Sequence, residues 1–225
     1  MTITGLVTTD GTVFEIADTE DVKLTVNSVK FALISGTEKT SSGGITYAGI
    51  TASLFKLAGS NSELELNGVV VDGTIDTDTY NAVDMATCSV IDASAGTLTL
   101  TSCEFKALTH ATLELIKLGT GATLVMTPKT AAAEEEPAVE PTETSMRRNG
   151  GEVAPTTFTG IERKAGGGSV FDVSLSGEAT LTIQNADFTT CTCTGTGAPG
   201  GAIKITNAGT GTVTLQDVTL KTYVR

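Results

Sequence analysis

The chain has 225 residues, a formal net charge of −12, 25 glycines, 4% aromatic residues and no tryptophan. Its 14 Lys and Arg against 26 Asp and Glu offer few cations for phosphate neutralisation, which argues against a nucleic-acid binder. No apolar run approaches the about 20 residues of a membrane-spanning helix. Thr is the commonest residue, and a Thr-rich, Gly-rich sequence favours strands and turns. The composition predicts a soluble, acidic, all-β protein.

Short strands are predicted in pairs along the chain. An eight-residue frame carries apolar residues at positions 1, 3, 6 and 8. Positions 1 and 3 alternate as in one strand, and the shift to 6 and 8 predicts a bend before a second strand. Copies start at Leu24, Leu64, Leu98, Leu124, Leu181 and Val213. Pro128 interrupts the fourth copy, whose position 8 would be Phe158.

A further short apolar stretch precedes most copies of the frame, joined to it by a small polar turn. These stretches are Val13–Ile16, Leu54–Leu57, Val90–Ile91, Leu113–Ile116, Val170–Val173 and Ala202–Ile205. Each unit therefore predicts strand, turn, strand, bend, strand and loop. The starts lie 26 to 57 residues apart, a variation that a solenoid tolerates because insertions project from its corners. We expect a parallel β-solenoid of about six coils, as one domain over residues 1–225.

Residues 131–151 interrupt this pattern with Ala, Glu, Pro and Thr, followed by Met146-Arg-Arg-Asn-Gly-Gly151. Five Glu and two Pro argue against packing in a core, so we expect a flexible acidic loop inserted in one coil. A domain boundary is the alternative. Because the frame resumes after the loop, one domain is favoured.

Gly200-Gly-Ala-Ile203 and, more loosely, Gly43-Gly-Ile45 and Gly166-Gly-Gly-Ser-Val170 resemble the Gly-Gly-Ala-aliphatic element of the polymorphic outer-membrane proteins of chlamydiae. The second element of that family, Phe-x-x-Asn, corresponds to Phe31–Ile34, Phe105–Leu108 and Phe188–Cys191, with Asn absent each time. The resemblance implies a right-handed parallel β-helix of the pectin-lyase-like class and a surface adhesion role. No functional residue is carried over.

The chain has four cysteines: Cys88, Cys103, Cys191 and Cys193. Cys103 occupies core position 6, and Cys191 lies three residues after Phe188, as Leu108 does after Phe105. Burial of both as small hydrophobes is the favoured interpretation, and a disulfide between neighbouring coils is the alternative. The Cys191-Thr-Cys193 spacing fits neither a zinc knuckle nor a redox motif. His110 is the only histidine, and we expect it in a surface loop. No oriented nucleophile lies near it in sequence.

Two further patterns resemble ligand-binding motifs but lack the sequence context that such motifs need. Gly195-Thr-Gly-Ala-Pro-Gly200 matches the dinucleotide fingerprint, but a strand rather than a helix is predicted to follow it. Asp72, Asp76 and Asp78, with Asp84 nearby, are weak calcium candidates, because they lack the spacing of an EF-hand. A solvated acidic loop is the favoured interpretation. We expect no metal and no cofactor.

A pectin-lyase-like, carbohydrate-active enzyme is one alternative function. Glycan hydrolysis needs two facing carboxylates, and the acids and bases of this chain do not align in the frame. An ice-binding protein is another alternative, because threonines recur at outward positions and would form a flat face. The face comprises Thr97, Thr99, Thr123, Thr180, Thr182, Thr212 and Thr214. Lys23, Glu63 and Glu65 interrupt it, and Thr also suits any exposed strand.

The favoured function is non-enzymatic: a structural or adhesive β-solenoid displayed on a cell or particle surface. Its expected partners are a protein or glycan surface, or copies of itself through uncapped coil ends, since open coils expose unpaired strand edges. The chain would then be a segment of a longer repeat protein or part of an end-to-end assembly. Residues 1–10 carry no visible secretory signal. An extracellular or cell-surface location is nevertheless expected from the resemblance.

Overall fold

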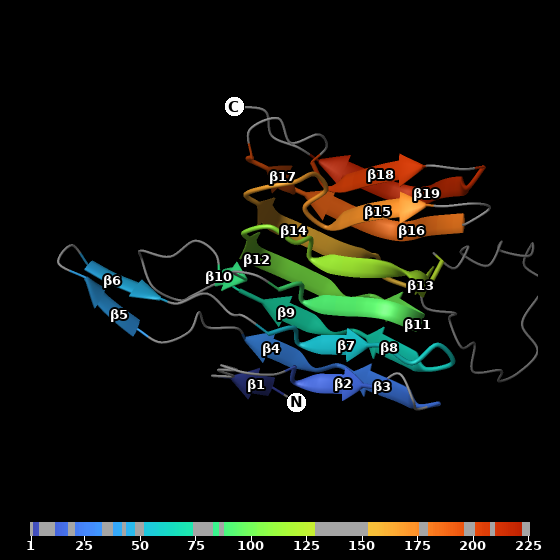
Figure 1. The fold of residues 1–225 in the computed structure, drawn as a ribbon, viewed down its shortest axis with the longest axis horizontal. Coiled ribbons are helices and arrows are strands. Elements are labelled where there is room, and N and C mark those ends of the chain that lie inside the picture. Colours follow the sequence, from blue (N-terminus) through green and yellow to red (C-terminus); the bar gives the residue numbers. More distant parts are fainter. Residues whose placement is uncertain are drawn as a thin grey trace, which may run out of the picture.

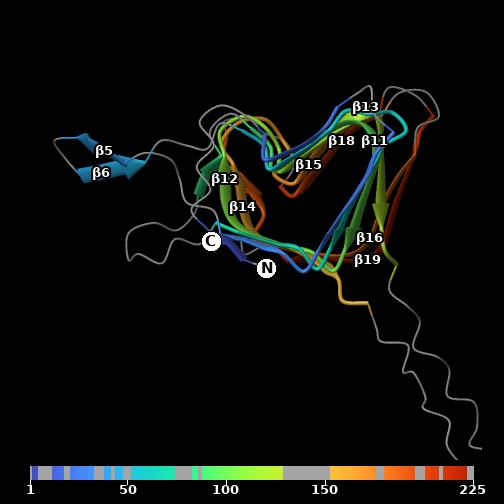
Figure 2. The ribbon, with the colours of Figure 1, turned by 90° about the horizontal axis from the view of Figure 1, so that it is seen from below.

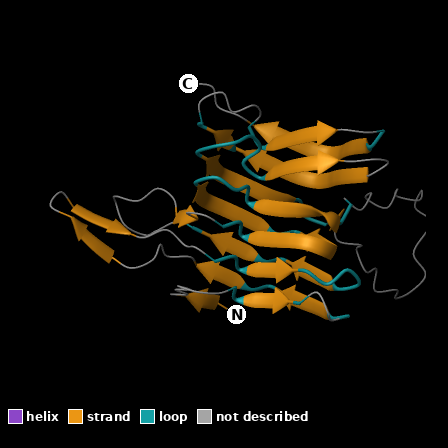
Figure 3. Cartoon of the chain, viewed as in Figure 1, coloured by secondary structure: helices purple, strands orange, loops and turns teal. Residues whose placement is uncertain are grey.

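The computed structural model describes residues 2–4, 12–17, 21–32, 38–41, 44–47, 52–73, 83–85, 88–128, 153–175, 180–195, 201–207 and 210–221. These residues form strands and connecting turns, without a helix (Figure 3). The predicted all-β class is confirmed. No helix in this part of the chain could span a membrane.

Most strands belong to two sheets. The 9-stranded sheet contains β1 (Thr2–Thr4), β4 (Lys30–Ala32), β9 (Val70–Asp72), β10 (Val83–Met85), β12 (Glu104–His110), β14 (Thr156–Arg163), β16 (Thr180–Thr189), β17 (Thr192–Cys193) and β19 (Thr212–Lys221). The 6-stranded sheet contains β2 (Phe14–Ile16), β3 (Lys23–Asn27), β7 (Phe55–Leu57), β8 (Glu63–Asn67), β11 (Ile91–Thr101) and β13 (Ile116–Met126).

Two small sheets complete the described chain. They are β15 (Phe171–Leu175) with β18 (Ile203–Asn207), and β5 (Glu38–Ser41) with β6 (Gly44–Tyr47). The β5–β6 pair is antiparallel, whereas all other described pairings are parallel. Strands far apart in sequence lie side by side in layers, from the N-terminal strands in blue to the C-terminal strands in red (Figure 1). Seen along the stack, the layers overlap and the sheets curl around a shared interior (Figure 2).

The register of these layers agrees with the predicted frame. Position 1 forms a column in which Leu24, Leu64, Leu98 and Leu124 lie beside one another. Phe158 lies between Phe105 and Phe188, as predicted for the position 8 that follows Pro128. In-register stacking places like side chains in contact, so each apolar position becomes one column of the core.

Phenylalanines form the centre of the core. The ring of Phe158 stacks on Phe105 at 5.3 Å and on Phe188 at 4.8 Å between centroids. Phe171 meets this stack edge-on. A second group joins Phe14, Phe31 and Phe55 near the N-terminal end. Burying such rings supplies the largest single apolar contributions to stability that this aromatic-poor chain offers.

In five of the six frames, all but the one that Pro128 interrupts, the bend is made by the fifth residue, which adopts a left-handed backbone conformation. The φ angles are 52° at Ser28, 59° at Gly68, 51° at Ser102, 50° at Asn185 and 51° at Asp217. A non-glycine residue rarely adopts this conformation, and Asn and Asp tolerate it best. The predicted bend is therefore confirmed, and its position in the frame is fixed.

The predicted turn before the third frame is absent, because β11 runs unbroken from Ile91 to Thr101. The pairing of β11 with β13 instead shows a register shift between Ala93 and Ala95, where the turn was expected. Gly96 has φ +78°, and a Cβ there would lie 2.5 Å from the carbonyl oxygen of Gly59. A bulge with a close backbone approach thus replaces the turn.

Candidate functional site

The predicted threonine face follows the outward side of the strands that begin each frame. Thr97 pairs with Thr123, and Thr180 and Thr182 pair with Thr212 and Thr214. Thr123, Thr180, Thr212 and Thr214 are exposed, whereas Thr97, Thr99 and Thr182 are half-buried. Val125, 41% exposed, lies beside Thr99 and breaks the run of hydroxyls. The register thus forms two separate threonine groups within this face.

Charged residues occupy the same face in the first layers, as predicted. The Nζ of Lys23 lies 3.1 Å from an oxygen of Glu63 and 2.5 Å from an oxygen of Glu65. Hydrogen bonding with Glu65 raises the pKa of Lys23, and the same contact lowers the pKa of Glu65. These groups therefore neutralise one another across the strands and stay charged near neutral pH.

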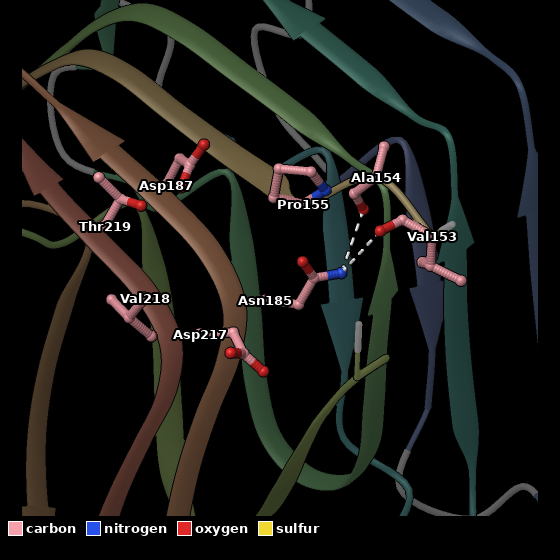
Figure 4. A pocket seen from close by; sticks show the side chains of 8 residues that line it. All are labelled: Val153, Ala154, Pro155, Asn185, Asp187, Asp217, Val218 and Thr219. Atoms are coloured by element: carbon pink, nitrogen blue, oxygen red, sulfur yellow. Dashed lines mark hydrogen bonds between the residues drawn. The ribbon is translucent and has the colours of Figure 1, made fainter. Parts of the chain in front are cut away.

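An open pocket of about 630 Å³ lies at the bend of the last layers (Figure 4). Asp187 and Asp217 line it together with Thr219 and the backbone stretch Val153–Pro155. Asn185 also lines the pocket. Its side-chain amide points toward the carbonyl oxygens of Val153 and Ala154 and donates a hydrogen bond to each. Two carboxylates, with no cation among the described residues that line it, make this pocket acidic.

Asp76 and Asp78 lie outside the described residues, and the nearby Asp84 lies in β10; the calcium candidate whose side-chain contacts the structure gives is Asp72. Its Oδ2 lies 2.9 Å from the Nζ of Lys30 and 3.3 Å from the Nζ of Lys106. Two cations already neutralise this carboxylate, which makes it a poor calcium ligand. The described part of the chain contains no group of three metal-ligating side chains.

His110 is fully buried, so its predicted place in a surface loop is wrong. It lies in β12 between Met85 and Arg163, and its Nδ1 is 3.1 Å from the carbonyl oxygen of Cys88. Burial lowers the pKa of His110 to about 4, and the nearby Arg163 charge adds to this effect. The frame ends at Phe105, whereas β12 continues beyond it, which is why the sequence pattern missed this burial.

Arg163 holds the loop that follows β14 from inside the protein. Its Nε donates to Thr112 O at 2.8 Å, and its Nη1 donates to Gly167 O at 2.6 Å and to Asp172 Oδ2 at 2.9 Å. The Glu114 carboxylate lies 3.6 Å from Nη2, and burial raises its pKa. Because these donors and carboxylates pair with one another, the cluster is a structural network. The Nε2 of His110 beside it lacks a hydrogen-bond partner among the described residues.

The predicted burial of Cys103 and Cys191 is confirmed. Their side chains donate weak hydrogen bonds to Leu66 O at 3.1 Å and Phe158 O at 3.4 Å. Burial raises the pKa of Cys103, and that of Cys191 to about 11. Cys88 is also buried and Cys193 is half-buried, and none of these four thiols forms a disulfide in this structure.

Sequence reasoning missed a column of alternating charges on the strands that open each layer. Glu15 pairs with Lys56 at 2.6 Å, Asp92 with Lys117 at 2.9 Å, and Asp172 with Lys204 at 3.2 Å. Lys56 also lies beside Asp92 in register. The signal was present, because each charged residue stands between two apolar residues and the sign changes from one strand to the next. We call these six residues the charge column.

The charge column continues between its second and third pairs. Ile91 N donates to Leu115 O where Ile91 pairs with Ile116. Ile116 N donates to Val170 O in the same way, at 3.0 Å, which places Ile116 beside Phe171 and Lys117 beside Asp172. The column therefore runs from a negative charge at Glu15 to a positive charge at Lys204.

Comparison with protein-family models gives no match, and comparisons with curated proteins and with solved structures give none either. The described chain is an all-β protein whose two large sheets are parallel and whose strands stack in register.

Proposed function

We propose that this chain is a right-handed parallel β-helix with a structural or adhesive, non-enzymatic role on a cell or particle surface. The observation that carries the proposal is the in-register stacking of like residues over successive layers, as in the column of Leu24, Leu64, Leu98 and Leu124. A solenoid built this way is a stiff rod whose corners accept loops of any length. The resemblance to chlamydial surface proteins agrees with this role.

The outer surface supports a role in contact rather than catalysis. Charged side chains on it are paired along the layers, as in Lys23 with Glu65 and Lys30 with Asp72. Such pairing along the strands makes this part of the surface polar and rigid, as a contact surface requires. An extracellular location, with a protein or glycan as partner, belongs to the same proposal.

The segment between Pro128 and Val153 fits a loop inserted in one coil of a single domain. Asn185 contacts both Thr127 and Val153, so the chain leaves and re-enters the layers at one point. Residues 131–151 themselves lie outside the described residues.

The test displays the chain on beads at one density and measures attachment to cells and to glycan-coated surfaces. We expect attachment above that of beads carrying the heat-unfolded chain. Equal attachment of both would overturn the adhesive role. Cleavage of polysaccharides by the purified chain, lost on unfolding, would instead support the carbohydrate-active alternative.

Ice binding is the second candidate, favoured by the pairing of Thr180 with Thr212 and of Thr182 with Thr214. Paired strands place such hydroxyls about 4.8 Å apart, and alternate residues about 7 Å apart, in a regular array. Thermal hysteresis that is present in the native chain and lost in Thr182→Lys would support this candidate. Its absence in the native chain would remove it.

A further inference from the structure

The last layer, β18 and β19, leaves an apolar surface uncovered by any described residue. Ile183 and Phe188 of β16 are 0% and 1% exposed, whereas Leu215 and Leu220, in register with them on β19, are 49% and 58% exposed. The same inward-facing positions are thus buried in one layer and exposed in the next. Exposed apolar edges of this kind are sites of association.

We propose that this surface binds the first layer, β2 and β3, of a second copy of the chain, head to tail. The proposal rests on the solenoid proposed above and names one of its partners. Charge complementarity selects this occupant, because the charge column ends in Lys204 on the last layer and in Glu15 on the first. A head-to-tail junction continues the alternation, whereas two last layers would oppose lysine to lysine.

The apolar residues match across the same junction. Stacking β3 on β19 in the register of the inner layers places Leu24 and Val26 over Val213 and Leu215. Stacking β2 on β18 places Phe14 over Ile203, directly next to the Glu15–Lys204 pair. The contact repeats the packing that already joins consecutive layers within the chain.

Strand β1 limits this junction. β1 pairs with β4, in the register Ile3 to Phe31. The segment Thr219–Lys221 of β19 occupies the corresponding position in the last layer, so it takes the place of β1 in a complete junction. Val26 and Phe31 of the first layer are only 8% and 1% exposed, so docking requires displacement of the residues that cover them, β1 among them, which makes association weaker than the apolar surface alone suggests.

The experiment measures the association of the full chain by sedimentation velocity at rising protein concentration. We expect reversible growth to dimers and longer chains of copies. Leu215→Lys with Leu220→Lys should abolish growth. Val125→Lys is the matched control, because Val125 is also an exposed apolar residue, 41% exposed, but lies on the outer face. Equal loss in both variants would overturn the proposal.

Charge reversal tests the register. Glu15→Lys and Lys204→Glu should each lower the association constant about tenfold, because each sets like charges across the junction. A mixture of the two variants should restore growth, since both junctions in an alternating chain then carry opposite charges. Urea denaturation of each variant checks that the folded layers survive. Growth of Lys204→Glu alone at the native rate would overturn the head-to-tail arrangement.

A gain-of-function variant covers the case in which the native chain stays monomeric at every concentration. Thr2→Pro with Ile3→Pro should weaken β1. Consecutive residues of a strand present their N–H groups to opposite edges, so one of these two N–H groups faces β4, and proline removes it. This variant should associate more strongly than the native chain. A monomeric native chain together with a monomeric variant would overturn the proposal. Bead attachment by the Leu215→Lys, Leu220→Lys variant tests the adhesive role separately.

Discussion

The side-chain amide of Asn185 donates a hydrogen bond to the carbonyl oxygen of Val153, with 3.2 Å between the two atoms. The same nitrogen lies 3.3 Å from the carbonyl oxygens of Thr127 and Ala154. Thr127 precedes residues 129–152 and Val153 follows them, so one buried side chain fixes both ends of that segment. Its left-handed backbone, with φ 50°, turns the amide toward these carbonyls.

Asn185→Ala should lower the free energy of unfolding by about 1–3 kcal/mol, because it leaves buried carbonyl groups without their donor. Asp217→Ala is the control, since Asp217 has the same backbone conformation, with φ 51°, on an exposed part of β19. The control should lose much less in urea denaturation. Equal losses would show that backbone strain, and not the amide, carries the effect.

The apolar columns were predictable and the buried polar groups were not. The frame identified Leu98 and Phe158 as core residues because burial of like residues in parallel strands leaves a regular spacing in sequence. His110 follows the frame, and its burial depends on the continuation of β12 beside β14. No local periodicity encodes such a tertiary neighbour. The partners of Asn185 are equally distant in sequence, 31 to 58 residues away.

Phe158→Ala should destabilise the chain by about 3–5 kcal/mol, as deletions of buried aromatic rings do. Phe158 is 0% exposed and stacks on both Phe105 and Phe188. Phe14→Ala is the matched control, because Phe14 is half-buried, stacks on one ring, that of Phe55, and meets Phe31 edge-on. Urea denaturation should show a clearly smaller loss for the control. The reverse order would contradict the placement of the phenylalanine stack at the centre of the core.

Asp72→Asn should cost about 0.2–1 kcal/mol at low salt and less at high salt, because its lysine partners are partly exposed. Lys30 and Lys106 are 46% and 32% exposed, against 11% for Asp72. We also expect added calcium to leave the melting temperature of the native chain unchanged. A calcium-dependent rise that disappears in Asp72→Asn would contradict this assignment and support the calcium site.

Acid should destabilise the folded chain through His110. Burial lowers its pKa to about 4 in the folded state, from 6.5 in an exposed chain, so the folded state binds fewer protons between these values. The stability that the neutral imidazole provides is complete above pH 6.5 and is lost as the pH falls toward 4. The full loss amounts to about 3 kcal/mol.

Glu114 acts in the opposite direction, because burial raises its pKa and its protonation in acid favours the folded state. Urea denaturation at about pH 7 and about pH 5 should therefore show a loss of stability that increases in Glu114→Gln and shrinks in His110→Gln. Since His110→Gln also changes packing, the quantity to compare is each variant's difference between the two pH values. An unchanged difference in His110→Gln would show that other groups cause the acid sensitivity.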